Sequence, residues 1–486
     1  MSLIAILVLP LAAMVLCLVP LEKISSTLAG WIAPVATLLA AAAVLALAIG
    51  DSLHVAAGNS IIAIANWIQL DGLSALILLL VGLVGTTAAL FSWGYMARRA
   101  HGEKRRRLYY VHFNLFFFAL LAVPLAVEPN LVWVAIEFTA LFSVLLVAYE
   151  NTHEALEAAW KYIAMMFMGA AIALFGFLIL FWAFKLGGGV TYTWAGLRAA
   201  APHMPPVLTK TAFLMILVGF GMKVGFVPMH TWLPDAHSQA PAPVSALMSG
   251  VLLTVAFYAL LRFKVIADGA LGPDYVRTLL VIVGLASLLV AASLLLTQRD
   301  YKRMLAYHSI EHMGLIALGA AAGTTLAIAA VLLHILGHGL AKAVLFLASG
   351  EILLVEGTSE IEKVPALLSR RPVLGGIFGF GLVALLGLPP FSLFVSELNM
   401  IRAELDVGLG WAAGISLALM AVIFAAVMGH GRHLLLGGAG ASGKPAATPG
   451  IVAIPLVGGL IACAVFGLSA WPLQSLLYAA AHVVVK

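Results

Sequence analysis

The chain has 486 residues, of which 63% are hydrophobic and only 10% are charged, and its mean hydropathy is +1.10. A soluble domain cannot bury this much apolar surface, so the composition excludes a soluble protein and indicates a polytopic membrane protein. The formal net charge is +5, but the basic residues fall in the loops between apolar runs. That placement fits membrane topology better than nucleic-acid binding.

Cysteine is scarce, and its placement argues against bound metal clusters. Cys17 and Cys463 stand alone in the first and last apolar segments, and no CxxC pair occurs. We therefore expect no iron–sulfur cluster and no structural zinc in this chain. Residues 1–20 lack a basic start and an A-x-A cleavage site, so we interpret them as a retained helix rather than a cleaved signal peptide.

Apolar runs long enough to cross a bilayer predict about fourteen membrane helices. In chain order they cover residues 2–20, 28–49, 72–95, 109–127, 130–149, 161–184, 207–229, 243–262, 276–297, 304–322, 325–355, 373–402, 411–430 and 450–470. Residues 50–71 and 186–206 are predicted as partly amphipathic surface connections, and residues 471–483 as a short terminal helix. The expected fold class is an all-α polytopic membrane protein.

Lysine and arginine are distributed unevenly between the two sets of loops. If the N-terminus is outside, the inner loops hold 15 basic residues, among them Lys302, and the outer loops hold 8, among them Arg262 at the end of the 243–262 run. By the positive-inside rule, we expect both termini on the outer, periplasmic side of a cell's inner membrane. The run RRAHGEKRRR at residues 98–107 then lies on the cytoplasmic face as a topology anchor that can touch anionic lipid.

The predicted helix that starts near residue 207 has features that a simple membrane span lacks. The stretch FLMILVGFGMKVGFVPMHTWLPDAHSQAPAPVSA, residues 213–246, embeds Lys223 in an apolar run and is followed by Gly225 and Pro228, which predict a helix break. In a membrane, a charge beside a break is tolerated only inside protein or along a watery cavity, as in transporter ion sites. A lysine that snorkels from a helix end is the alternative, but about four turns of apolar residues precede Lys223.

Glu137 is a second charge within an apolar run, LVWVAIEFTALFSVLLVAY. A lone carboxylate there would simply be protonated, whereas a nearby Lys223 would stabilise both charges. Protonation of Glu137 would remove that support, so the pair could pass a proton onward. The alternative is a static link between two helices.

Two further segments carry titratable residues into predicted membrane helices. VLLHILGHGLAKAVLFLASG places His334, His338 and Lys342 at i, i+4 and i+8, on one helical face. Two histidines at this spacing can bind zinc, but no HExxH pattern and no third ligand is near, so a proton-relay face is favoured. KRMLAYHSIEHMG carries His308, Glu311 and His312 together into the predicted helix at 304–322, which indicates a polar path although a single histidine could be a core residue.

A second predicted break lies in the other half of the chain. GFGLVALLGLPPFSLFVSELNMI is interrupted at Pro389–Pro390 and presents Glu397 soon afterwards. Paired interruptions of this kind are typical of inverted-repeat transporters. Lys161, at the start of its predicted helix, is either a relay residue or a snorkelling lysine.

These motifs resemble the proton-pumping, antiporter-like membrane subunits shared by respiratory complex I, Mrp cation/proton antiporters and membrane-bound hydrogenases. The resemblance runs from about Leu73 to Arg432, and its most specific part is KVGFVPMHTWLPDAHSQAPAPVSA. The stretches EALEAAWKYI, YHSIEHMG, HGLAKAVLF and LPPFSLFVSE are most similar to the hydrogenase 4 component F type of group 4 hydrogenase and formate hydrogenlyase complexes.

The resemblance implies a fold of about fourteen helices with two inverted five-helix repeats and broken seventh and twelfth helices. It places the first three helices at residues 1–95, the repeats at 96–262 and 263–432, and the last helix with a short tail at 433–486.

The resemblance also implies roles for individual residues. Glu137 resembles the fifth-helix glutamate, and Lys223 the seventh-helix lysine. His334, His338 and Lys342 resemble the relay of the eleventh helix, and Glu397 the terminal charge of the twelfth. Thr254 stands where complex I subunits usually carry an eighth-helix lysine, so waters and the group from His308 to His312 would have to bridge Lys223 and Lys342.

The sequence therefore favours a proton-translocating membrane subunit of an electron-transfer-driven, hydrogenase-like complex. The expected route starts near Lys161 or His308, passes Glu137 and Lys223, continues through His312, His338 and Lys342, and leaves past Glu397. Partner subunits would carry the redox chemistry, because no ligand set for metal clusters, flavin or nicotinamide is visible. An Mrp-type cation/proton antiporter subunit, with sodium in place of or beside the proton, is the first alternative, and a membrane scaffold with static charge pairs is the second.

Overall fold

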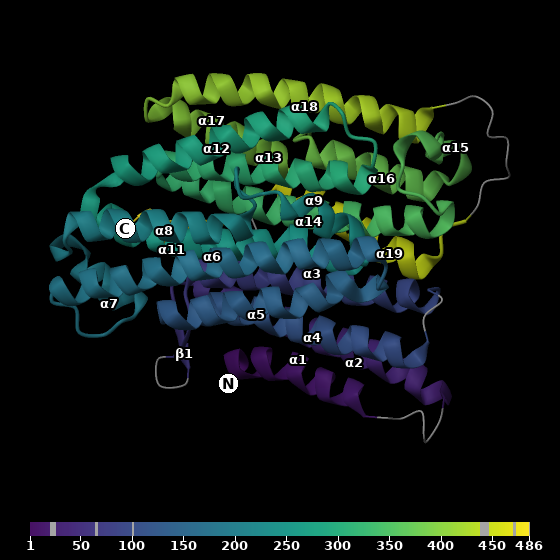
Figure 1. Ribbon diagram of the computed structural model, residues 1–486, viewed down its shortest axis with the longest axis horizontal. Coiled ribbons are helices and arrows are strands. Elements are labelled where there is room, and N and C mark those ends of the chain that lie inside the picture. Colours follow the sequence, from purple (N-terminus) through teal and green to yellow (C-terminus); the bar gives the residue numbers. More distant parts are fainter. Residues whose placement is uncertain (20–25, 64–66, 100–101, 438–446, 470–472, 486) are drawn as a thin grey trace.

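The computed structural model describes residues 1–19, 26–63, 67–99, 102–437, 447–469 and 473–485. Figure 1 shows an elongated bundle in which the long helices run side by side in one direction. Helices α1 (Ser2–Leu18) and α2 (Ser26–Ala56) form one edge of the bundle, and α17 (Ser392–Asp406) and α18 (Gly410–Leu436) form the opposite edge. The expected all-α fold class is observed.

The remaining helices lie between these edges. The first half of the chain contributes α3 (Gly72–Ala97), α4 (Glu103–Leu125), α5 (Pro129–Val147), η2 (Ala148–Glu150), α6 (His153–Leu186), α7 (Trp194–Ala200), η3 (Ala201–His203), α8 (Pro206–Val224) and α9 (Trp232–Gln239). The middle contributes α10 (Ala242–Leu247), the π-helical turn η4 (Met248–Leu252), α11 (Leu253–Leu271), α12 (Pro273–Leu295), α13 (Tyr301–Ala322) and α14 (Thr325–Glu356). The last part contributes η5 (Ile361–Lys363), α15 (Leu367–Arg370), α16 (Pro372–Leu385), α19 (Gly450–Leu468) and α20 (Gln474–Val485).

A short hairpin joins α2 to α3. Strands β1 (Ile61–Ala63) and β2 (Ile68–Leu70) pair antiparallel with Ile61 opposite Leu70, and they are the only strands in the part of the chain that the structure describes. The sequence predicts a surface connection over residues 50–71, but α2 continues as far as Ala56. Val55 is buried near the end of this extension, so packing against the bundle accounts for the added turns.

By length and composition, eleven helices among the described residues can cross a membrane. Helices α1, α16 and α20 are apolar but shorter. Helix α13, which carries His308, Glu311 and His312, is not among the eleven. The chain is thus a polytopic membrane protein.

Two helices are interrupted inside the bundle, where the sequence predicts breaks. Helix α8 ends at Val224, Gly225 adopts the left-handed conformation with φ of 84°, and α9 begins only at Trp232. The Trp232 indole donates a 2.8 Å hydrogen bond to the Met222 carbonyl oxygen, which provides a partner for a carbonyl near the helix end. The second interruption separates α16 from α17 at residues 386–391.

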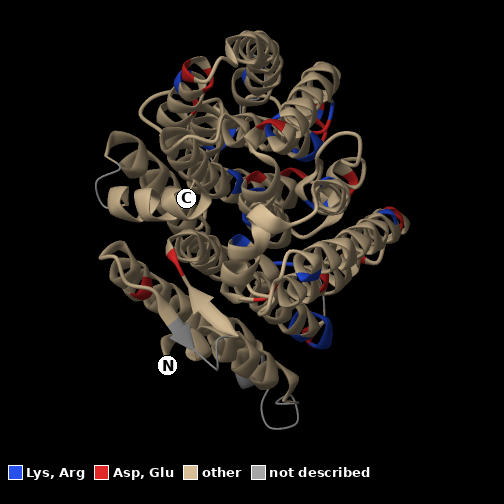
Figure 2. Cartoon of the chain, turned by 90° about the vertical axis from the view of Figure 1, so that its left-hand side faces the viewer, with Lys and Arg blue, Asp and Glu red and all other residues tan. Residues whose placement is uncertain are grey.

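The centre of the bundle consists of two helical segments, each with an apolar stretch of 18 residues that is completely buried. One is the segment Ala242–Leu271, made of α10, η4 and α11, and the other is α14. They touch through glycine, because a Cβ atom on Gly250 would lie 2.7 Å from the Gly339 carbonyl oxygen. Figure 2, which looks along the helices, shows charged positions inside this cross-section as well as at its rim. The candidate site is built around this centre.

Candidate functional site

Glu137 on α5 and Lys223 on α8 form a buried ion pair. The Lys223 Nζ atom lies 3.3 Å from Glu137 Oε1, and it donates a 2.6 Å hydrogen bond to the Ile136 carbonyl oxygen. Lys223 is 3% exposed, and Glu137 Oε2 is buried without a hydrogen-bond partner among the residues that the structure describes. The fold therefore brings together the two charges that the sequence pairs, directly beside the break that follows Val224.

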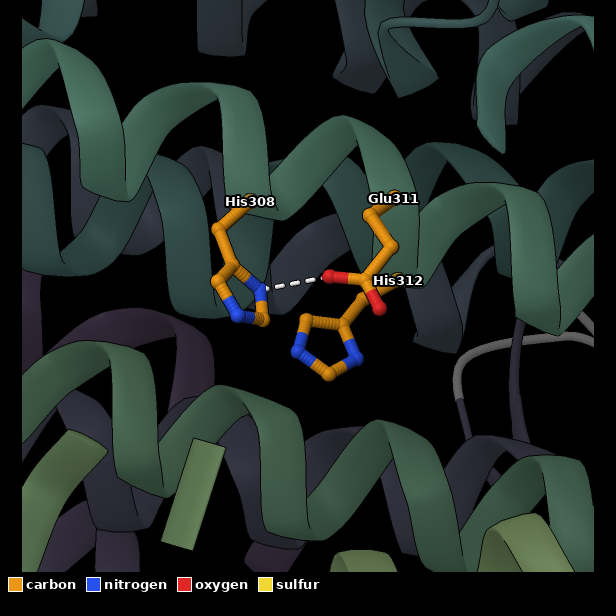
Figure 3. Close-up of side chains that lie close together, drawn as sticks. All are labelled: His308, Glu311 and His312. Atoms are coloured by element: carbon orange, nitrogen blue, oxygen red, sulfur yellow. Dashed lines mark ion pairs between the residues drawn. The ribbon is translucent and has the colours of Figure 1, made fainter. Parts of the chain in front are cut away.

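A second buried group comes from one face of α13. The His308 Nδ1 atom lies 2.7 Å from Glu311 Oε2, and the His308 and His312 rings stack with centroids 4.8 Å apart. Figure 3 shows the three side chains leaving the same side of their helix, with the ion pair dashed. All three residues are buried, so these titratable groups lie inside the protein and away from its surface.

Histidines of the neighbouring helix α14 contact this group on α13. The His312 Nδ1 and His334 Nε2 atoms are 2.9 Å apart, and the His312 and His338 ring centroids are 4.9 Å apart. The Lys342 Nζ atom, also fully buried, donates a 2.5 Å hydrogen bond to the Leu305 carbonyl oxygen on α13. The predicted face of α14 therefore packs against the predicted polar segment of α13.

Glu397 on α17 lies next to the histidines of α13 and α14. One carboxylate oxygen of Glu397 and one nitrogen of each of His312 and His334 lie within 4.8 Å of one another. The neighbouring Ser396 hydroxyl lies 3.0 Å from His334 Nδ1. Glu397 is only half-buried and packs against Gly387 in the interruption between α16 and α17.

Lys161 lies apart from this buried row. Its side chain is 49% exposed and pairs with Glu157 at 2.7 Å and with Asp235 on α9 at 3.2 Å. Asp235 also pairs with Arg303 on α13 at 2.8 Å. In the structure, Lys161 is the ninth residue of α6 rather than the first residue of its helix, and its ion pair with Asp235 connects it to α9 beyond the break.

Sequence reasoning missed His237 and misplaced Lys302. His237 on α9 is fully buried and stacks on Phe346 with centroids 5.1 Å apart, and neither ring nitrogen has a hydrogen-bond partner among the described residues. The sequence places Lys302 in an inner loop, but it is buried in the first turn of α13 and donates a 2.6 Å hydrogen bond to the Ser238 carbonyl oxygen. Its position at the end of α9 explains the burial, because an ammonium group satisfies carbonyl oxygens at a helix C-terminus. The only local signal for His237 was its position in the DAHSQAP stretch beside the break.

Arg262 is likewise not the loop residue that the sequence predicts. It is buried on α11, and its two terminal nitrogens each lie 2.7 Å from an oxygen of Asp71. Burial alone would raise the pKa of the Asp71 carboxyl, but the charge and hydrogen bonds of Arg262 outweigh this effect and hold the pKa below its usual value. The pair ties the start of α3 to α11.

The arrangement can move protons between neighbouring side chains. Imidazole rings both donate and accept hydrogen bonds, and carboxylate and ammonium groups at the ends can hold the charge. Within the described part of the chain, no hydrogen bond or ion pair joins Lys223 to the histidines of α13 and α14. Thr254 lies on the intervening helix, is buried, and donates to the Val251 carbonyl oxygen at 2.8 Å, so it adds no charge there.

Comparison with known proteins gives a consistent result. Residues 126–424 match the family described as NADH:quinone oxidoreductase/Mrp antiporter, TM, and residues 61–110 match the N-terminus of chain 5 of NADH-ubiquinone oxidoreductase (complex I). A hydrogenase-4 component F homolog of Methylacidiphilum infernorum is 36% identical over 370 residues, which cover 75% of this chain and 78% of that protein. An NAD(P)H-quinone oxidoreductase chain 4 of Microcystis aeruginosa is 32% identical and covers 69% of this chain, which spans 59% of its length.

Solved structures show the same fold. A subunit of the archaeal membrane-bound sulfane sulfur reductase, a respiratory membrane complex, is similar with a TM-score of 0.90 and 25% identity over 100% of this chain and 98% of that one. A chain of the Mrp complex from Dietzia superposes with a TM-score of 0.85 at 22% identity, covering 99% of this chain and 97% of its own. The family match spans more than half of the sequence and agrees with these folds, so the chain belongs to the NADH:quinone oxidoreductase/Mrp antiporter family of membrane subunits.

Proposed function

We propose that this chain is the proton-translocating membrane subunit of an electron-transfer-driven complex of the hydrogenase 4 type. The observation that carries the proposal is the buried row of ionisable side chains on α13, α14 and α17 together with the Glu137–Lys223 pair. Charges inside a membrane helix bundle are costly, and they typically mark ion and proton pathways. Similarity to the hydrogenase-4 component F homolog supports the choice of complex.

The proposed relay has two parts. In the first, a proton that reaches Glu137 weakens its attraction for Lys223, so the lysine can give up its own proton. In the second, His308, His312, His334 and His338 pass protons between Lys342 and Glu397. Lys161 and Asp235 provide a partly exposed entry beside the α8–α9 break, and Glu397 provides a half-buried exit.

His237 and water bridge the two parts in this proposal. The ring lies on the α9 side of the break and packs against α14 through Phe346, one turn from Lys342. Both of its nitrogens can bind water, since neither has a hydrogen-bond partner in the part of the chain that the structure describes. This route replaces the eighth-helix lysine, whose position Thr254 occupies.

We also propose a membrane architecture of about fourteen spans, with α8 and α9 as one span and α16 and α17 as another. Residues 1–95 supply three spans, 96–262 and 263–432 are two inverted repeats, and 433–486 supply the last span and the tail. The two interruptions support this division, because each falls in the fourth span of its repeat.

The proposed orientation puts the basic stretch at the junction of α3 and α4 in the cytoplasm and both termini outside an inner membrane. Of the basic residues behind this proposal, Lys23, Lys444 and Lys486 lie outside the described residues. Arg370 and Arg371 belong to α15 or directly follow it, and Figure 1 places α15 at the opposite end of the bundle from α7 and the N-terminus. The expected partners are the other membrane and peripheral subunits of the complex, which carry its redox centres, and lipid.

An Mrp-type cation/proton antiporter subunit is the second candidate, since the matching family includes Mrp antiporters. Neighbouring genes separate the two: hydrogenase or dehydrogenase subunits in the first case, small antiporter subunits in the second. If the chain is instead a purely structural scaffold, replacing the buried charges should change stability and leave proton movement intact.

The deciding experiment measures substrate-driven proton uptake in inverted membrane vesicles from cells carrying Lys223→Ala. Complex assembly is checked in the same membranes, and Lys210→Ala, an exposed lysine on the same helix, is the matched control. Assembly with loss of proton uptake in Lys223→Ala alone supports the relay. If Lys223→Ala takes up protons at the wild-type rate, the buried charges have only a structural role.

A further inference from the structure

We propose that His312, His334 and Glu397 form a binding site for a divalent transition-metal ion of the zinc type, and that an ion held there blocks proton movement. The binding follows from the arrangement of the three side chains. The block rests on the proposed function, so the experiments below separate the two.

The fold supplies the third ligand that is absent from the local sequence. His334 lies on α14 with His338 and no further ligand near them in the chain, but α13 brings His312 and α17 brings Glu397 to the same point. One ligand atom of each of the three residues lies within 4.8 Å of the others. Two histidines and a carboxylate leave one position open on a four-coordinate zinc ion, which water can fill.

The spacing requires only small side-chain movements. Zinc–nitrogen bonds of about 2.0–2.1 Å place tetrahedral ligand atoms roughly 3.3 Å apart. The His312 Nδ1 to His334 Nε2 distance of 2.9 Å therefore has to open slightly. The separations from the Glu397 oxygen, which are at most 4.8 Å, can adjust by rotation of a long side chain that is only half-buried.

Ser396 prepares His334 to act as a ligand. Its hydroxyl donates a 2.8 Å hydrogen bond to the Leu393 carbonyl oxygen, so it has a lone pair left to accept a hydrogen bond from the His334 Nδ1–H at 3.0 Å. This arrangement keeps the His334 proton on Nδ1 and directs the Nε2 lone pair at His312. Hydrogen bonds of this kind fix the tautomer and orientation of metal-binding histidines.

His312 has a nitrogen available to hold the displaced proton. In the absence of an ion, its Nδ1–H donates to the His334 Nε2 lone pair. When an ion replaces that proton, His312 remains neutral with its proton on Nε2, which is buried and has no partner in the part of the chain that the structure describes. Buried polar atoms are rarely left unpaired, so this unpaired nitrogen is consistent with a site that takes a further group.

The negative charge of Glu397 and its partial exposure also favour binding of a metal ion at this site. Glu397 contributes a negative charge to the site. Glu397 packs at the interruption between α16 and α17 and is the least buried of the three ligands, so the ion enters from that side. Once bound, the ion occupies both lone pairs through which His312 and His334 would exchange protons.

The binding test counts zinc on the purified complex after loosely held metal has been removed, with Co²⁺ as a spectroscopic probe of ligand number. We expect one ion that is lost or at least about tenfold weaker in Glu397→Gln, and about 10- to 100-fold weaker in Ser396→Ala, whose side chain contacts no ion. Glu311→Gln is the matched control and should retain the ion. Unchanged zinc in Glu397→Gln and Ser396→Ala, or loss of zinc in Glu311→Gln alone, would overturn the assignment.

The functional test adds zinc to inverted vesicles during substrate-driven proton uptake. The zinc concentration for half-inhibition should rise about 10- to 100-fold in Ser396→Ala. Bound zinc with undiminished proton uptake would refute a relay through His312 and leave the metal site intact. If the wild-type complex binds no zinc while Lys223→Ala still abolishes proton uptake, the metal site is refuted and the proposed function stands.

Discussion

The Lys223 ammonium group lies closer to the Ile136 carbonyl oxygen, at 2.6 Å, than to the Glu137 carboxylate, at 3.3 Å. The lysine thus has two acceptors on α5, and only one of them can change its charge. Because the backbone acceptor persists when Glu137 is protonated, the lysine keeps its position while its electrostatic environment changes. A fixed position with a variable charge is what a proton relay requires.

Glu137→Gln should therefore preserve assembly and slow proton uptake. The amide retains the shape of the side chain, while the lost charge-assisted contact is worth about 1.5–3 kcal/mol. We expect a decrease of roughly 10- to 100-fold in the rate of uptake. Glu154→Gln, at an exposed position near the start of α6, is the control and should behave like the wild type. Equal rates in the two variants would show that the Glu137 charge is not used.

Trp232→Phe should destabilise the break between α8 and α9. The phenyl ring fills much of the same volume, but the Met222 carbonyl oxygen loses its 2.8 Å hydrogen bond. The Met222 oxygen keeps a longer 3.3 Å hydrogen bond from the Gly225 N–H, so the variant should lose about 0.5–1.5 kcal/mol, the net contribution of one hydrogen bond. Thermal unfolding of the purified complex measures the effect, and Trp160→Phe, whose side chain is 72% exposed, provides the comparison. A melting temperature equal to that of Trp160→Phe would contradict this explanation of the break.

Asp71→Asn should lower stability in a pH-dependent way. Since Arg262 holds the folded-state pKa of Asp71 below its usual value, the carboxylate contributes stability above the unfolded pKa of about 3.9. This contribution is lost as the pH falls through the lower folded-state pKa. The stability difference between wild type and variant should be largest near neutral pH and shrink below about pH 4.

Asp274→Asn is the matched control for that experiment. Asp274 pairs with Arg277 at 3.3 Å, but its side chain is 91% exposed. Exposed ion pairs contribute about 0–1 kcal/mol, so this variant should melt close to the wild type. Chemical denaturation across a pH series measures both variants, and a pH-independent difference for Asp71→Asn would be evidence against the stabilised carboxylate.

Gly250→Ala should disturb the contact between the two central helices. The added methyl group would lie 2.7 Å from the Gly339 carbonyl oxygen, which belongs to backbone and has no room to move. Overpacking of this kind costs about 1–3 kcal/mol. The amount of assembled complex in the membrane and its melting temperature are the readouts. Gly414→Ala, on α18 with open space around it, should be neutral or slightly stabilising.

The sequence by itself determined the membrane class, the two interruptions and the presence of charges inside apolar runs. These features depend on contiguous residues: Gly225 and Pro228 end a helix through their own backbone, and a spacing of i and i+4 puts His334 and His338 on one face. The number of spans and the orientation of the termini follow from patterns of the same local kind, and they stay predictions.

Only the tertiary structure decided which side chains meet. Ser396 lies 62 residues from its hydrogen-bond partner His334, and Arg262 lies 191 residues from Asp71. Such contacts depend on how whole helices pack, and no local periodicity encodes them. For the same reason Lys302 and Arg262 read as loop residues in the sequence but are buried in the fold. The metal-ligand geometry at Glu397 exists only because α13, α14 and α17 converge there.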